Sequence, residues 1–167
     1  MLNKLYIFLY IRLFGQKRYA KKIGVKFGQD CSFNGLSKFG SEPYLIKMGD
    51  HVRIVSVNFV NHDGGVWVLR DTESDLDLVD TITIGDNVFI GQETTLLPGT
   101  IIGNNVVIGA RSLVKGTLEP NYVYAGVPAK KICTLEEYKE KLLTNGIRTK
   151  HMDAITKKQY LLKFFKI

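Results

Sequence analysis

The chain has 167 residues, of which 45% are hydrophobic, so it is long enough to bury the core of one domain. Its net charge of +7 comes from the ends: residues 1–26 carry seven Lys or Arg and no acid, and residues 130–167 carry ten bases against four acids. The remaining middle has six bases and twelve acids, which argues against nucleic acid as a partner. Cys31 and Cys133 have neither metal nor redox spacing, which indicates a reducing, cytoplasmic location.

Residues 1–22 are expected to form an N-terminal helical segment. Lys4 and Arg12 interrupt its apolar run, which is shorter than the ~20 residues that a membrane span requires, and no signal-peptide cleavage site is evident. Two alternatives remain. We favour a helix packed on the following domain, because amphipathic helices usually find their own core. The other is an interfacial helix that contacts the inner membrane peripherally through residues 2–22. Its basic flank would consist of Lys17, Arg18, Lys21 and Lys22.

Apolar residues then recur every six positions in two sets. The first set is Phe27, Phe33 and Phe39, with the smaller Cys31 and Ser37 between them. The second set is Met48, Ile54 and Val60, with Val52 and Asn58 at the small positions. The two sets are offset by three residues, so an insertion around residues 40–46 must break the phase.

The repeat is interrupted between Val60 and Ile82. Continuing the grid would place Arg70 at an inward position, which a narrow core cannot accept unpaired. Residues 62–81 are therefore predicted to form a loop inserted into the repeat. Long loops on rigid scaffolds often carry binding and catalytic groups.

From residue 84 to residue 114 the period of six is unbroken. The large apolar positions are Ile84, Ile90, Leu96, Ile102, Ile108 and Val114. The fourth residue after each is mostly small or β-branched: Val88, Thr94, Thr100, Val106, Ser112 and Leu118. A period of six fits neither an α-helix nor a flat strand, but it fits a parallel β-helix with three hexads per coil. We expect an all-β domain of about four coils over residues 23–133, followed by a C-terminal helical tail over residues 134–167.

The end of the repeat adds a second motif. It reads Ile108-Gly109-Ala110-Arg111-Ser112-Leu113-Val114 and, after a short gap, Tyr124-Ala125-Gly126-Val127-Pro128-Ala129-Lys130-Lys131-Ile132. Together with the hexads it resembles the hexapeptide-repeat acyltransferases, and in particular the maltose, galactoside and capsular-polysaccharide O-acetyltransferases. The resemblance covers about residues 45–133. It implies a left-handed β-helix, acetyl-CoA as the acyl donor, and a homotrimer with active sites between subunits.

The chain has three histidines that can act as a base near neutral pH. His51 occupies the turn slot that Asn87 and Asn105 hold in later hexads, and His151 lies in the tail. His62 remains, where strand becomes loop, although a turn of this kind is more often an ordinary exposed turn. The resemblance adds weight, because sugar O-acetyltransferases of this superfamily have their catalytic histidine at the mouth of such a loop.

His62 is thus predicted to take the proton of an acceptor hydroxyl, whose oxygen attacks the acetyl thioester directly. Its other ring nitrogen requires an orienting acceptor. A backbone carbonyl, Asp63 and Glu93 all remain open as that acceptor.

The donor site is expected at the end of the repeat. Gly109 and Ala110 are expected to leave backbone groups open for the amides of pantetheine, while Lys115 and Lys130 can meet phosphates. The resemblance also places two side chains beside the thiol arm, Phe89 and Gln92. The family commonly has tryptophan where this chain has Phe89.

The acceptor implied by the resemblance is a sugar hydroxyl of a surface polysaccharide or lipid-linked glycan precursor. Side chains that can supply stacking and hydrogen bonds to a glycan are Asn61, Asp63, Trp67 and Arg70. Alternatives are a streptogramin-type antibiotic O-acetyltransferase, an N-acetyltransferase of amino sugars, a serine acetyltransferase, and a non-catalytic β-helix scaffold. The repeat has too few histidines for a zinc site, so no metal is expected.

Overall fold

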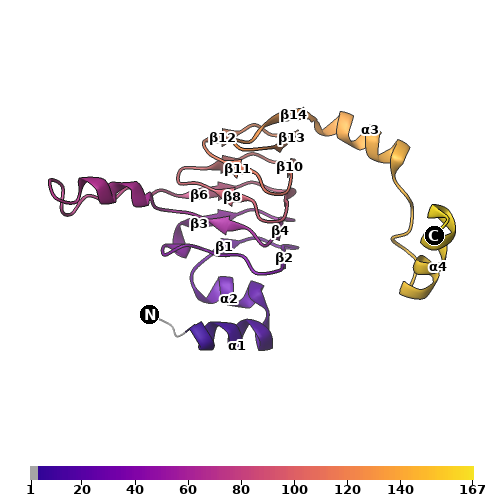
Figure 1. Cartoon of the computed structure of the whole chain (residues 1–167), viewed down its shortest axis with the longest axis horizontal. Coiled ribbons are helices and arrows are strands. Elements are labelled where there is room, and N and C mark those ends of the chain that lie inside the picture. Colours follow the sequence, from indigo (N-terminus) through magenta and orange to yellow (C-terminus); the bar gives the residue numbers. More distant parts are fainter. Residues whose placement is uncertain (1–3) are drawn as a thin grey trace. The chain divides into compact units, whose positions relative to one another are not determined.

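The computed structural model describes residues 4–167, so the first three residues of the predicted N-terminal segment lie outside it (Figure 1). The chain divides into two compact units, one ending at Glu136 and the other spanning Glu137–Ile167. The first unit contains parallel sheets preceded by helices, and the second is helical. Parallel β-structure with helices at both ends agrees with the fold class predicted from the six-residue period.

Three sheets form the faces of the β-helix. The first sheet has the order β1-β3-β6-β9-β12 and consists of β1 (Lys26–Phe27), β3 (Ile46–Met48), β6 (Ile82–Ile84), β9 (Ile101–Ile102) and β12 (Thr117–Leu118). The second has the order β14-β13-β10-β7-β4-β2 and consists of β2 (Ser32–Asn34), β4 (Arg53–Val55), β7 (Val88–Ile90), β10 (Val106–Ile108), β13 (Tyr122–Ala125) and β14 (Lys130–Thr134). The third has the order β11-β8-β5 and consists of β5 (Asn58–Phe59), β8 (Thr95–Leu96) and β11 (Leu113–Val114).

The strands pair in parallel except for β13 with β14, which pair antiparallel. Val106 pairs with Val88, and Ile101 pairs with Thr83, so these neighbouring strands of the unbroken hexads are shifted by 18 residues. Three hexads therefore complete one coil, as the repeat predicts.

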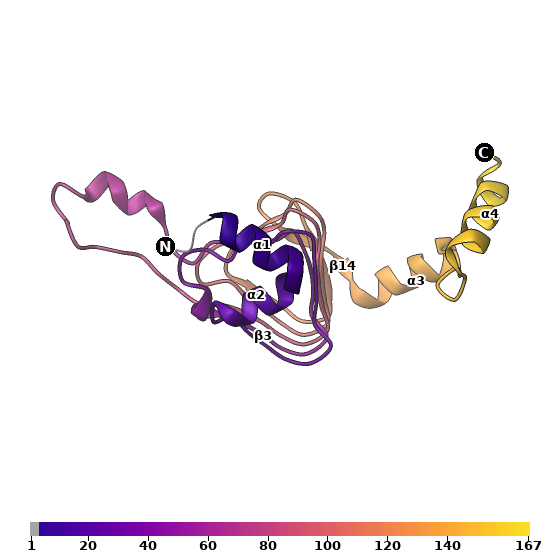
Figure 2. The same cartoon turned by 90° about the horizontal axis from the view of Figure 1, so that it is seen from below.

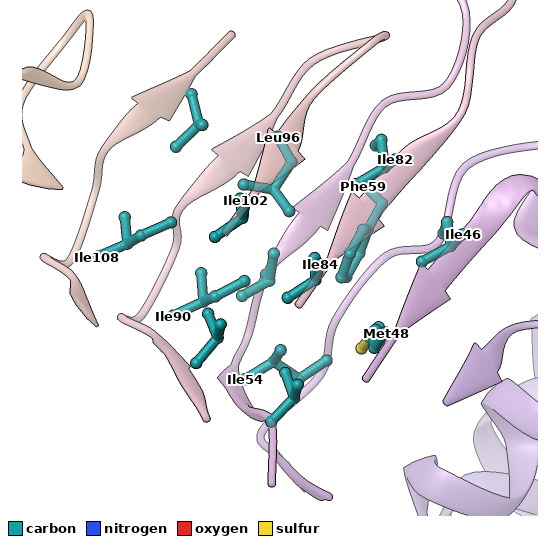
Figure 3. Close-up of a cluster of buried hydrophobic side chains, with 14 of the residues drawn as sticks. Ile46, Met48, Ile54, Phe59, Ile82, Ile84, Ile90, Leu96, Ile102 and Ile108 are labelled. Carbon is teal, nitrogen blue, oxygen red and sulfur yellow. The ribbon is translucent and has the colours of Figure 1, made fainter. Parts of the chain in front are cut away.

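The inward positions of the unbroken hexads form the core (Figure 3). All six large apolar positions between residues 84 and 114 are buried, and so are all six small positions between residues 88 and 118. The hydroxyl groups among them are paired with backbone oxygens: Thr94 and Ser112 donate to the carbonyl of Gly109, and Thr100 donates to that of Leu97. Paired hydroxyls avoid the cost of burying free polar groups.

The six-residue pattern does not predict the inward positions correctly in the coil before the loop. Two positions predicted to point inward are not buried: Asn58 and Val60. Two neighbouring side chains are buried instead: Val57 and Phe59. Ile54 pairs with Ile90 and Phe59 pairs with Leu96, so the stretch from Ile54 to Phe59 is one residue shorter than the equivalent stretch in the next coil. A one-residue change reverses which side chains face the core.

The corner between the first and second sheets carries a ladder of side chains. His51 Nδ1 lies 2.8 Å from Oδ1 of Asn87, whose Nδ2 donates to Asn105 at 2.8 Å, and Asn105 Nδ2 donates to Asn121 at 2.9 Å. All four residues have positive φ, a conformation that asparagine tolerates better than most residues. The prediction that His51 is a turn residue is confirmed.

Helices α1 (Lys4–Phe14) and α2 (Gln16–Lys22) lie at the N-terminal end of the coils (Figures 1 and 2). Helix α2 buries Ala20 and Gln16, and Gln16 Nε2 donates to the carbonyl oxygen of Ser37 at 2.9 Å. Of the two alternatives for the N-terminal segment, α2 therefore follows the first, a helix packed on the following domain. No side chain of α1 from Leu5 onward is fully buried, and Leu13 is 73% exposed. Within residues 4–167 no helix is long and apolar enough to cross a membrane.

The C-terminal helices are α3 (Leu135–Asn145), which begins in the first unit, and α4 (Ala154–Phe165). Gly146 follows α3, and its backbone N–H donates to the carbonyl of Leu142. Asp153 caps α4 by accepting from the backbone N–H groups of Ile155 and Thr156. The hydrogen bond from the Thr156 hydroxyl, together with these N–H groups, lowers the pKa of Asp153.

Candidate active site

A loop leaves the coils after β5 and returns at β6, standing clear of the sheets (Figures 1 and 2). Its neck is closed by two backbone bonds, from Asp80 N to the Asn61 carbonyl at 2.8 Å and from Asp63 N to the Leu78 carbonyl at 2.9 Å. His62 lies between them, bridged to Val79. The neck therefore fixes the backbone of His62 where the strand becomes the loop.

The imidazole of His62 is oriented by a segment from the preceding coil. Its Nδ1 lies 3.1 Å from Oε2 of Glu42 and 3.4 Å from Oγ of Ser41. Both residues belong to the insertion at residues 40–46, where Glu42 immediately precedes the short 3₁₀ helix η1 (Pro43–Leu45). When Nδ1–H donates to Glu42, the neutral ring presents Nε2 as a proton acceptor.

Neither carboxylate that the sequence left open contacts His62. Asp63 accepts from the backbone N–H of Gly65 at 2.8 Å and so caps the 3₁₀ helix η2 (Gly64–Leu69) in the loop. Glu93 accepts from Arg111 Nε at 2.8 Å, and this bond holds the pKa of Glu93 below its usual range. Sequence reasoning missed Glu42, although the phase break around residues 40–46 marked its segment.

A pocket of about 300 Å³ opens beside His62. The predicted residues that line it together are His62, Asp63, Trp67 and Arg70. Trp67 is 76% exposed and offers its ring to a ligand. The guanidinium of Arg70 donates to the carbonyls of Ser74 and Leu76 and to Asp77, so it also maintains the shape of the loop.

Asn61 does not face this pocket. Its side chain is fully buried, and its Nδ2 donates to the Asp80 carbonyl at 3.4 Å. Its Oδ1 has no hydrogen-bond partner within residues 4–167. Asn61 thus supports the neck of the loop from beneath.

The predicted donor residues lie elsewhere on the coils. His62 is at the corner between the third and first sheets, and Lys115 is at the same corner between β11 and β12. Three others lie at the corner between the second and third sheets: Gln92, Gly109 and Ala110. Phe89 is 40% exposed on the outer face of β7. None of these residues lines the His62 pocket, and all of them except Lys115 lie on a face or corner of the chain other than that of His62.

The sequence led us to expect that Gly109 leaves its backbone groups open to a ligand, but both groups are already bonded within the chain. Its N–H donates to the Tyr124 carbonyl at 2.8 Å, and its carbonyl accepts from Thr94 and Ser112. A Cβ at position 109 would approach the Cβ of Ala125 to 2.9 Å, so glycine is required there for close packing of adjacent coils. Ala110, which is exposed, remains the candidate for pantetheine contact.

Two adjacent lysines on β14 differ in their surroundings. Lys131 pairs with Glu119 and lies 3.8 Å above the Tyr122 ring, and the bond to Glu119 raises the pKa of Lys131. Lys130 is exposed, and no ion pair within residues 4–167 involves it. Its charge is therefore available to a phosphate.

A family model described as bacterial transferase hexapeptide (six repeats) matches residues 81–116. The chain is 46% identical over 149 residues to Protein CapG of Staphylococcus aureus, and the match covers 87% of each chain. The chain belongs to the hexapeptide-repeat transferase family. The resemblance inferred from the hexads is confirmed. Relatives named as acetyltransferases, among them the galactoside O-acetyltransferase of Escherichia coli K12, make this chain an acyltransferase.

Two further relatives of this transferase are informative. It is 57% identical over 51 residues to the putative lipopolysaccharide biosynthesis O-acetyl transferase WbbJ of Escherichia coli K12, over 30% of this chain and 26% of WbbJ. A solved galactoside acetyltransferase in complex with coenzyme A superposes with a TM-score of 0.53 at 25% identity, over 77% of this chain and 74% of that one.

Proposed function

We propose that this transferase is an acetyl-CoA-dependent O-acetyltransferase that modifies a sugar hydroxyl of a surface polysaccharide or lipid-linked glycan precursor. The observation that carries the proposal is the contact between His62 Nδ1 and Glu42, which leaves Nε2 of the imidazole to act as a base in a residue that lines the loop pocket. The coenzyme A complex of the galactoside acetyltransferase supports the donor, and the name of WbbJ supports a glycan acceptor. The coils wind left-handed in this proposal, as in the family.

The reaction requires a proton acceptor and a stabilised charge. Neutral His62 takes the proton of the acceptor hydroxyl as its oxygen attacks the acetyl thioester, a role that contributes ~10²–10⁴ in rate. The imidazolium formed is stabilised by the Glu42 carboxylate 3.1 Å from Nδ1. When the tetrahedral intermediate collapses, the imidazolium returns the proton to the leaving thiolate of coenzyme A. No covalent bond to the enzyme forms.

The loop pocket supplies contacts suited to a sugar. The exposed ring of Trp67 can cover an apolar sugar face, and the carboxylate of Asp63 can accept from hydroxyl groups. Arg70 keeps the loop in the conformation that presents both. These features support a glycan over a small amino acid as the acceptor.

We infer that the active unit is a homotrimer. The thiol-arm residues Phe89 and Gln92 lie on a different sheet face and corner from His62 in the same chain. A neighbouring chain that brings its second sheet against the corner of His62 supplies the missing half of each site. A closed threefold arrangement then gives three equivalent sites.

We also infer peripheral contact with an anionic membrane through α1. Apolar side chains cover most of its exposed surface, including Leu5, Phe8 and Leu13. Residues 1–26 contain no acid, so the adjacent charge is uniformly positive.

Release of free coenzyme A from acetyl-CoA, measured across sugars, streptogramins and serine with the His62→Ala variant as control, tests the proposal. Sugar-dependent release that His62→Ala abolishes supports it. Release with streptogramins but no sugar would identify an antibiotic O-acetyltransferase. A folded protein that releases coenzyme A with none of them would be a scaffold.

A further inference from the structure

An apolar groove runs between the N-terminal helices and the first coil, with a volume of about 560 Å³. We call it the α1 groove. Its apolar lining comes from α1, α2 and residues 36–40, and includes Ile7, Ile11, Ile23, Leu36 and Phe39. Its volume falls in the range of roughly 300–1,000 Å³ that is typical of small-molecule sites. The wall at Ser37 is fixed, because Gln16 of α2 is buried and donates to its carbonyl.

The charged side chains that line this groove are all positive. Arg12 and Lys38 both line it, both are exposed, and no acidic residue lines it. No ion pair within residues 4–167 involves either cation. An apolar channel with two unpaired cations complements an amphiphilic anion, in which a long apolar chain ends in a phosphate.

One lining residue of the α1 groove adjoins the active site. Gly40 lines the groove and also adjoins the neck of the loop, since a Cβ at Gly40 would lie 3.1 Å from Oδ1 of Asn61. The next residue, Ser41, has its Oγ 3.4 Å from Nδ1 of His62. Gly40 and Ser41 are consecutive, and successive Cα atoms are ~3.8 Å apart, so the residue that lines the groove directly precedes the residue beside the imidazole.

We propose that the α1 groove binds the lipid phosphate end of the acceptor, with the apolar chain along the groove and the phosphate at Arg12 and Lys38. The glycan joined to that phosphate then extends past Gly40 to His62. This inference rests on the proposed function, because the acceptor is taken to be a glycan that is acetylated at His62. It specifies that the acceptor carries a phosphate-linked isoprenyl or acyl chain.

Calorimetric titration of the full chain with farnesyl phosphate, below its micelle concentration, tests the groove without any turnover. Saturable binding at one molecule per chain is expected. Farnesol and inorganic phosphate each lack half of the ligand and should bind at least about tenfold more weakly. Dodecyl phosphate, titrated in the same way, distinguishes a saturated straight chain from an isoprenyl chain.

Matched variants locate the binding site. Arg12→Gln with Lys38→Gln, or Leu36→Gln alone, should weaken farnesyl phosphate binding by about tenfold or more. The controls are Arg18→Gln, which removes an exposed cation outside the groove, and Leu13→Gln, which removes an exposed apolar side chain outside it. Each control should change farnesyl phosphate binding by less than about twofold. All four variants should keep the wild-type rate toward a free sugar.

Three results would overturn the inference: no binding of farnesyl phosphate, equal binding of farnesol, or equal weakening by the Arg18 and Leu13 controls. A fourth is a lower molar mass for Leu36→Gln by light scattering with no change for Leu13→Gln, which would make the groove an interface between copies. If sugars are acetylated but farnesyl phosphate does not bind, the groove inference fails alone. If farnesyl phosphate binds at the groove but no sugar is acetylated, the binding site stands and the proposed function fails.

Discussion

The Glu42 carboxylate lies 3.1 Å from Nδ1 of His62, although 20 residues separate the two along the chain. Glu42 comes from the insertion before β3, and His62 comes from the end of β5. The parallel pairing of β3 with β6 brings the insertion and the loop to the same corner. Each of the two interruptions of the repeat therefore contributes one partner of this pair. In the proposed mechanism the pair selects the reactive tautomer of His62.

Replacing His62 by Ala should lower acetyl transfer by ~100-fold or more, because the general base is lost. Its side chain is 45% exposed, so the fold should survive, and circular dichroism checks this. The control is His51→Asn, since asparagine already occupies the equivalent position of the corner ladder in the next coil. That variant should retain wild-type turnover. Full activity in folded His62→Ala would exclude the mechanism.

Glu42→Gln should lower kcat by about 10- to 100-fold while leaving KM for acetyl-CoA unchanged, as loss of an orienting partner does. The amide still accepts from Nδ1–H, but it carries no charge to stabilise the imidazolium. Steady-state kinetics separate the two constants. Glu73→Gln removes an exposed carboxylate of the same loop that does not line the pocket, and is the matched control. An equal fall in kcat for both variants would argue that Glu42 acts through general electrostatics of the pocket.

The core of the later coils could be predicted because an uninterrupted period of six leaves one register for every inward side chain. The same rule failed at Asn58 and Val60, because the stretch from Ile54 to Phe59 is one residue shorter than the stretch from Ile90 to Leu96 with which it pairs. Sequence spacing does not reveal which turn loses a residue. A slip of one position exchanges inward and outward side chains, and Phe59 fills the core instead.

The sequence could nominate a candidate base but not the partner that orients it. His62 was nominated by elimination among three histidines together with the family resemblance, whereas the contact with Glu42 required knowing which corner the insertion reaches. Gly109 shows the reverse case. A glycine at this position was predicted to expose its backbone groups to pantetheine. These groups are already bonded, and glycine is required there for close packing against Ala125.

Lys130→Ala should raise KM for acetyl-CoA by about tenfold, because a charge-assisted contact to phosphate is lost. It should barely change KM for the donor that lacks the 3′-phosphate. Lys131→Ala is the control, since the ammonium group of Lys131 is held by Glu119 and Tyr122. Equal effects of Lys130→Ala on both donors would mean that this residue does not meet the 3′-phosphate.

Light scattering should give the mass of a trimer, and co-expression of two inactive variants tests whether its sites lie between chains. His62→Ala chains keep an intact donor groove, and Ala110→Glu chains keep an intact base. Mixed trimers should recover activity, because some interfaces pair the two intact halves. Chains that carry both substitutions should not recover it. A monomer that is active at assay concentration would exclude the shared site.

The last prediction concerns the membrane surface. Of the four cations in the basic flank, Lys17 donates to the Cys31 carbonyl at 2.8 Å, and Lys22 donates to Tyr6, a bond that raises the pKa of Lys22. Arg18 and Lys21 are exposed, with no such contact among residues 4–167. Each cation near an anionic bilayer contributes ~1 kcal/mol to the binding free energy. Replacing both by Gln should therefore weaken the affinity for anionic liposomes, measured by sedimentation, by roughly 30-fold.

The matched control replaces two exposed helical cations outside this segment, Lys141 and Lys157, by Gln and should leave sedimentation unchanged. Deleting residues 2–14 removes the exposed apolar side chains of α1 but keeps Gln16, whose bond to Ser37 holds α2 on the coils. This deletion should abolish liposome binding and preserve turnover of a small soluble sugar, because the chemistry resides in the loop and coils. If the intact chain does not sediment with liposomes, or if the deletion unfolds it, α1 belongs to the protein core and the membrane contact is wrong.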